Sequence, residues 1–158
     1  MNPEGTVPVL SCYGGAVIIP DSESILEYIQ QGGLDGPNGN KLKLSADDSR
    51  LVKSNAWRSF ISKELCPIGK SSVLGSKKAL KEFKTMLAEK GKDIVGPFLC
   101  GDSVTVADCA LFPFIWRLNS EIGFANIKGC EEWEKWLSRC ESEPAFQKTI
   151  QSSWWWWW

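Results

Sequence analysis

The first apolar segments of the chain are short and rich in β-branched residues. They cover residues 7–12 (VPVLSC) and 16–19 (AVII), and the residues between them read Tyr-Gly-Gly. Short β-branched runs joined through glycines are typical of a β-hairpin, because glycine tolerates the backbone angles of tight turns. We therefore expect a hairpin near the N-terminus.

A helical pattern follows this hairpin in the segment PDSESILEYIQQGG, which starts at residue 20. Its isoleucines and leucine fall on one helical face, and its two glycines mark the end of the helix. Asp21 or Ser22 is suited to cap the start, because a short side-chain oxygen can accept from the first free N–H groups.

Residues 33–44 separate this first part from the rest of the chain. They hold glycines, a proline and asparagines, which is typical of a linker. We therefore expect residues 1–32 to form one unit and residues 45–151 to form a second. The tail at 152–158 ends in five tryptophans; we interpret it as a frayed end, with a membrane-interface anchor as the alternative.

Beyond the linker, the apolar positions recur at helical spacing. Ser45 and Asp48 (SADD) predict a capping box. The helix behind it is expected to end at Cys66-Pro67, because a residue before proline disfavours helical backbone angles. Further helices are predicted at 76–90, which is amphipathic, at 109–118, which is the most apolar, and at 131–140, with a short last one from Pro144.

Thr105 and Asp108, in the sequence TVAD, predict a second capping box before the most apolar helix of the chain. In such a box the Thr105 hydroxyl accepts from the Asp108 amide, and the Asp108 carboxylate accepts from the Thr105 amide. The arrangement is worth about 1 kcal/mol. A buried aspartate can also be catalytic, but this spacing favours the structural role.

Composition excludes several classes of function. The 158 residues include no histidine, which excludes histidine bases and ordinary histidine metal sites, and no Cys-x-x-Cys pair occurs among the six cysteines. We expect reduced thiols, a cytoplasmic location and no metal. The net charge is −1 without a dense basic run, and no segment approaches the ~20 apolar residues of a membrane helix, so neither nucleic acid nor membrane is an expected partner.

Three motifs carry a resemblance to a known family. The sequence FLCGDSVTVAD, residues 98–108, precedes an apolar helix and resembles a segment of the C-terminal helical domain of cytosolic glutathione transferases. NPEGTVPVL, residues 2–10, is similar to the family's loop into its third strand, where the Val-Pro peptide is cis. PDSESILEYI, residues 20–29, resembles the start of its third helix. The segments DSES, GPF and FQKT also resemble dehydroascorbate reductases, a subgroup of the family.

The resemblance implies a mainly helical fold, in which a partial thioredoxin-like α/β piece precedes the family's C-terminal helical bundle. It also implies glutathione as cosubstrate. Val7 would pair its backbone with the cysteinyl part of glutathione and Pro8 would keep that edge open, while Asp21 and Ser22 would hold the γ-glutamyl end. The alternative for Asp21 and Ser22 is a helix cap without a ligand.

The family's catalytic Tyr, Ser or Cys lies in a strand–helix–strand–helix segment that precedes the part matched here. We therefore assign no catalytic residue, interpret the chain as truncated at its N-terminus, and expect little activity from it. A truncated chain is also expected to hold residues 1–32 loosely, while residues 45–150 fold alone.

A complete version would conjugate glutathione to a small electrophile, or use it to reduce an oxidised substrate such as dehydroascorbate. Trp57, Phe60 and Trp116 either line the pocket for that substrate or belong to the core. Family members usually form homodimers. The alternatives are a non-catalytic helical interaction module, of the kind found in translation elongation factor subunits, or an inactive fragment.

Overall fold

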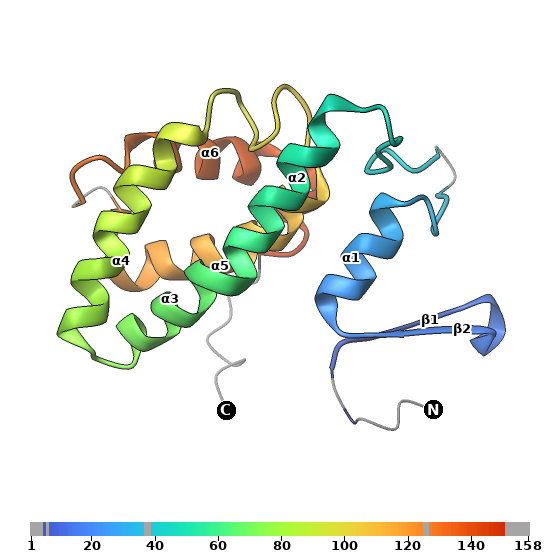
Figure 1. Ribbon diagram of the computed structural model, residues 1–158, viewed down its shortest axis with the longest axis horizontal. Coiled ribbons are helices and arrows are strands. Elements are labelled where there is room, and N and C mark those ends of the chain that lie inside the picture. The colour runs from blue at the N-terminus through green and yellow to red at the C-terminus, as the bar shows by residue number, and fades with distance from the viewer. Residues whose placement is uncertain (1–4, 6, 37–38, 125–126, 151–158) are drawn as a thin grey trace.

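The computed structural model describes residues 5, 7–36, 39–124 and 127–150 (Figure 1). Strands β1 (Val9–Cys12) and β2 (Val17–Pro20) form an antiparallel hairpin in which Val9 lies opposite Pro20. A 3₁₀ turn, Tyr13–Gly15, joins them, and its three residues all have positive φ angles. Two of those three residues are glycines, as such a turn requires. The expected hairpin is confirmed.

Helix α1 (Ser22–Gln30) follows the hairpin, and the remaining helices form a separate body beside it (Figure 1). The mainly helical fold with a small antiparallel hairpin is therefore confirmed. The helices of the body are α2 (Ser49–Phe60), α3 (Cys66–Val73), α4 (Lys77–Lys90), α5 (Val106–Ile122), α6 (Glu131–Ser142) and α7 (Pro144–Gln147). The tryptophan tail lies outside the described residues.

Two expected helix boundaries in the body are wrong. Helix α2 is capped by Asp48, not by Ser45, because the Asp48 carboxylate accepts from the N–H of Arg50 at 2.8 Å and is bound by its guanidinium. The helical backbone also does not end at Cys66-Pro67. A π-helical turn, Ile61–Leu65, leads directly into α3, and Pro67 lies in the first turn of that helix, the position where a helix tolerates proline best.

Helix α5 lies at the centre of the core, packed against α2, α3 and α6. Its inward side chains include Leu111 and Ile115, which are fully buried. Trp133 and Trp136 on α6 are also buried, and their rings meet edge to face with centroids 6.0 Å apart. Pro113 lies inside α5 without ending it. A core of this kind buries enough apolar area to order the body.

The Asp108 carboxylate joins three separate parts of this body. Helix α5 begins with the capping box that the TVAD sequence predicts, in which Asp108 Oδ2 accepts from the Thr105 N–H at 2.8 Å. Its Oδ1 accepts from the Leu99 N–H at 2.9 Å and from the indole N–H of Trp136 at 2.9 Å. Asp108 is 0% exposed, so these donors replace the water that it loses on burial.

Helix α1 packs against α5 and is also joined to α2 through buried polar contacts. Gln30, which is 3% exposed, accepts from the Ser54 hydroxyl at 2.7 Å and donates to Asn55 Oδ1 at 2.9 Å. Its backbone carbonyl accepts from the Leu44 N–H, so the end of the linker folds back onto α1. The hairpin itself stays largely exposed, and its loose attachment remains a prediction.

Replacing Asp108 tests how much the helical body depends on its carboxylate. Asp108→Ala leaves three buried N–H donors without an acceptor, on Leu99, Thr105 and Trp136, and each such donor costs about 1–3 kcal/mol. We expect the free energy of unfolding to fall by about 3 kcal/mol or more, measured by urea denaturation followed by circular dichroism. Asp102→Ala, at an exposed aspartate in the same loop, should change it by less than about 0.5 kcal/mol. Wild-type stability in Asp108→Ala would contradict the assignment.

Candidate functional site

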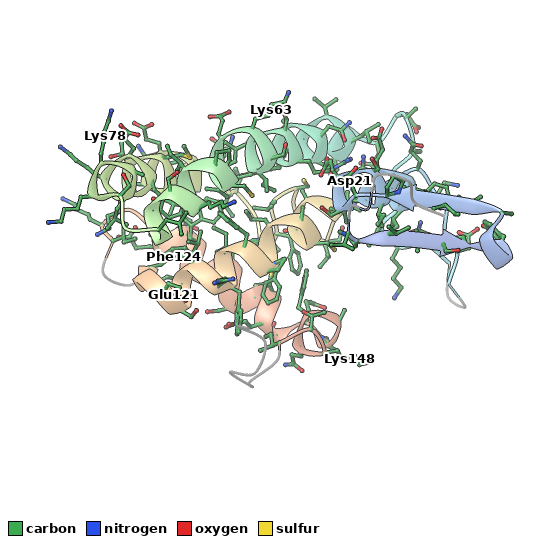
Figure 2. All side chains as sticks on the ribbon, turned by 90° about the horizontal axis from the view of Figure 1, so that it is seen from below. Asp21, Lys63, Lys78, Glu121, Phe124 and Lys148 are labelled. Carbon is green, nitrogen blue, oxygen red and sulfur yellow. The ribbon has the colours of Figure 1, made fainter. Side chains whose placement is uncertain are left out.

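The four residues expected to bind a ligand lie together where the hairpin meets α1. The Val7-Pro8 peptide is cis, and Val7 is 88% exposed. The Pro8 carbonyl accepts from the Asp21 N–H at 2.9 Å, which joins the start of β1 to the start of α1. Ser22 is the next residue and is exposed. Figure 2 shows Asp21 at the end of the hairpin that faces the helical body.

Asp21 has an unusual backbone conformation that its hydrogen bonds hold in place. Its φ of 65° and ψ of 147° belong to a region that is almost restricted to glycine and costs about 1–3 kcal/mol for other residues. Its carboxylate accepts from the Glu23 N–H at 2.7 Å, from the Ser24 N–H at 3.3 Å and from the Ser24 hydroxyl at 2.5 Å. Strain of this kind at an exposed position is typical of functional sites.

The same hydrogen bonds set the charge at this position. The Ser24 hydroxyl, followed by the Glu23 N–H, lowers the pKa of Asp21 below its ordinary value of 3.8. The carboxylate is therefore ionised at neutral pH. A carboxylate has about four lone-pair sites, and three hydrogen bonds leave room for one more donor. Asp21 is thus a helix cap that can still accept from a cation.

Ser22 has free hydrogen-bonding groups at the N-terminus of α1. In the part of the chain that the structure describes, neither its N–H nor its hydroxyl has a hydrogen-bond partner. The macrodipole of the helix favours a negative charge at this end. Ser22 and Asp21 together therefore suit a group that carries a carboxylate and an ammonium close to each other.

A residue that the sequence analysis did not single out lies beneath this site. Arg58 on α2 is 5% exposed, and its NH2 nitrogen lies 2.6 Å from a carboxylate oxygen of Glu23, in the first turn of α1. The sequence holds a weak signal for it, because Ser54 and Arg58 are four residues apart and follow one face of α2 beside its apolar stripe.

The aromatic residues expected to line a substrate pocket do not all meet. Phe60 lines an open groove of about 1170 Å³ between α2, α3 and α4. Trp57 lines a smaller hollow of about 360 Å³ beside it. The rings of Trp57 and Phe60 meet edge to face, with their centroids 5.9 Å apart. Trp116 lines neither hollow and packs against the core from α5. The 98% burial of Trp57 also makes it mainly a core residue.

The cysteines carry free thiols. Burial raises the pKa of the Cys109 and Cys130 thiols to about 11, and it also raises the pKa of Cys66, Cys100 and Cys140. These five thiols are protonated at neutral pH, so none of them offers the thiolate that a nucleophilic cysteine requires.

Metal and membrane sites were sought in the same ranges of the chain. Within residues 5, 7–36, 39–124 and 127–150, no three His, Cys, Asp or Glu side chains are placed to hold a metal ion. None of the helices described there is long and apolar enough to cross a membrane.

Comparisons with known proteins bear on both the sequence and the fold. Residues 75–139 match the family model described as the glutathione S-transferase C-terminal domain. A curated maleylacetoacetate isomerase from Emericella nidulans is 27% identical over 132 residues, which is 73% of this chain. The chain covers 57% of that relative's length.

Solved structures share the fold. A glutathione S-transferase from Pseudomonas fluorescens has a TM-score of 0.66 at 19% identity, with 90% of this chain and 73% of that chain covered. A glutathione transferase homologue from Lodderomyces elongisporus, with two GSH per subunit, has a TM-score of 0.65 at 22% identity, with 93% of this chain and 75% of that chain covered. Ure2p in complex with glutathione has a TM-score of 0.67 at 22% identity, with 94% of this chain and 77% of that chain covered. At these identities, the likeness shows a common fold.

The strain at Asp21 predicts different effects for two substitutions. Asp21→Ala removes the cap but keeps a Cβ in an unfavourable conformation, so we expect it to lower the free energy of unfolding by about 1 kcal/mol. Asp21→Gly also removes the cap but relieves the strain, so its stability should stay near that of the wild type. Urea denaturation of the two variants measures the difference. Equal stabilities for both would show that Asp21 is not strained.

Proposed function

Because this chain belongs to the glutathione S-transferase superfamily, we propose that it binds glutathione where the hairpin meets α1. The observation that supports this proposal is the hydrogen bond between the Asp21 N–H and the Pro8 carbonyl. It brings Val7 and Pro8 beside Asp21 and Ser22, from two segments separated by the whole hairpin. Two of the related structures also hold glutathione.

The chemistry of these residues matches the parts of glutathione. The γ-glutamyl end carries an α-carboxylate and an α-ammonium on one carbon. In our proposal the carboxylate accepts from the Ser22 N–H and hydroxyl, and the ammonium donates to the Asp21 carboxylate. The cysteinyl part pairs with the backbone of Val7, which is exposed at the start of the hairpin.

For the complete protein we propose glutathione conjugation, or a glutathione-dependent thiol transfer such as dehydroascorbate reduction. The name of the curated relative adds maleylacetoacetate to the substrates that deserve testing. We assign the catalytic group to no residue of this chain, because the family's catalytic residue lies in a segment that precedes the part matched here. We also propose that residues 33–44 separate the glutathione-binding part from the helical domain at 45–151.

Retention on glutathione resin tests the proposal. We expect the purified 158-residue chain to bind the resin and to elute with free glutathione. Ser22→Ala and Asp21→Gly should each weaken binding about tenfold, because each removes a hydrogen bond to a charged group of the ligand. Ser71→Ala, at an exposed serine on α3, is the matched control and should bind like the wild type. Affinity should not change between about pH 5 and pH 7 on account of Asp21, since its lowered pKa keeps it ionised there.

A wild-type chain that passes through the resin, or that stays bound when free glutathione is added, would contradict the proposal. Such a result would favour the non-catalytic interaction module, whose partner would then be sought through the helical domain.

A further inference from the structure

Arg58 is a buried cation whose compensation comes mainly from α1. One of its NH2 contacts is the ion pair of 2.6 Å with the Glu23 carboxylate, and another is the Glu23 carbonyl at 3.3 Å. On its own helix it donates only weakly, from NH1 to Asn55 Oδ1 at 3.4 Å. Its Nε is buried and has no partner in the part of the chain that the structure describes. A buried guanidinium is costly unless it is paired, so the charge of Arg58 depends on Glu23.

Glu23 is held from both sides. Its N–H donates to the Asp21 carboxylate at 2.7 Å, while its carbonyl and carboxylate both accept from Arg58. The residue whose N–H binds the cap of α1 is therefore the same residue that Arg58 fixes to the helical body. A displacement of Glu23 would move Asp21 and Ser22 with it, because they are its direct neighbours in the first turn.

The contact belongs to a continuous polar seam between α1 and α2. Asn55 Oδ1 accepts from both Gln30 and Arg58, and Gln30 in turn accepts from the buried Ser54 hydroxyl. Gln30 lies at the last turn of α1 and Glu23 at the first, so the seam fixes both ends of the helix. The Glu23–Arg58 pair is the part of this seam nearest to the candidate site.

We propose that Arg58 is a positioning residue for glutathione binding, an inference that rests on the proposed function. Its main effect is electrostatic: it neutralises the Glu23 carboxylate, which would otherwise repel the ligand. Its contact with the Glu23 carbonyl at 3.3 Å, which helps to fix the first turn of α1, is the smaller contribution. The Glu23 side chain is 44% exposed, next to Ser22, where the α-carboxylate of glutathione is expected. The Glu23 carboxylate and the α-carboxylate of glutathione would repel each other there and weaken binding, unless a cation compensates one of the two charges.

The pair Glu23–Arg58 can be dissected with a double-mutant cycle. Arg58→Met keeps the length and apolar stem of the side chain but leaves the Glu23 carboxylate unpaired, so we expect glutathione affinity to fall about tenfold. In Glu23→Gln/Arg58→Met no unpaired carboxylate remains, and the affinity should return to within about threefold of the wild type. Titration calorimetry with glutathione measures all the affinities.

The matched control is Arg50→Met, on the same helix. Arg50 also forms an ion pair of 2.6 Å, with Asp48, but this pair lies at the start of α2, away from Glu23. The same substitution there should leave glutathione affinity unchanged. A second control separates the effect of charge on binding from the effect of the ion pair on stability. In the double variant the urea midpoint should stay below that of the wild type, although its glutathione affinity recovers. A purely structural role would move the two quantities together.

If Arg58→Met does not fold, Arg58→Lys takes its place together with the double variant. Lysine keeps the positive charge beside Glu23, so both proteins should bind glutathione within about threefold of the wild type. Unchanged affinity in Arg58→Met, or no recovery in the double variant, overturns the role of Arg58 alone. A wild-type chain that does not bind glutathione overturns the proposed function and, with it, this inference.

Discussion

The buried carboxylate of Asp108 accepts hydrogen bonds from three parts of the helical body, one of which, on α6, is far along the chain. These donors lie in the loop before α5, at the first residue of the capping box, and on α6. Because an unpaired buried polar group is costly, the loop and both helices reach their low-energy positions only together. This one side chain thus fixes a frame, made of the loop before α5, α5 itself and α6, on which the core packs.

The candidate site depends on that frame through α5, which α1 contacts directly, and through α2. Helix α2 packs on α5 with its apolar face and presents Ser54, Asn55 and Arg58 to α1. Helix α1 carries the strained Asp21 and the free groups of Ser22, and Asp21 in turn holds Pro8 at the start of the hairpin. A ligand-binding edge made of short, exposed segments thus obtains its geometry from a larger helical body.

Local signals in the sequence were sufficient for much of this arrangement. The TVAD box, the helix predicted at 76–90 and the β-branched hairpin all depend on residues close together in the chain. The junction of Val7-Pro8 with Asp21 and Ser22 was expected through a family resemblance, because no local rule pairs a loop with a helix cap across a hairpin.

What the sequence did not reveal depends on competition between neighbouring groups and, for Arg58, on a contact between distant residues. Ser45 fits a capping box, but Asp48 caps α2, where Arg50 binds its carboxylate. The proline signal at Pro67 was overridden by a π turn that joins α2 to α3. Arg58 is polar and sits beside an apolar stripe, which describes many exposed residues; its burial follows only once α1 covers it.

The most direct test of this account is a titration of the ¹⁵N-labelled chain with glutathione, followed by amide chemical shifts. We expect the largest changes at Val7, Ser22 and Glu23, with the amides of Leu99 and Thr105 unmoved because Asp108 holds them inside the helical body. Changes confined to the groove between α2 and α4, or no changes at any amide, would contradict a glutathione site at the junction of the hairpin and α1.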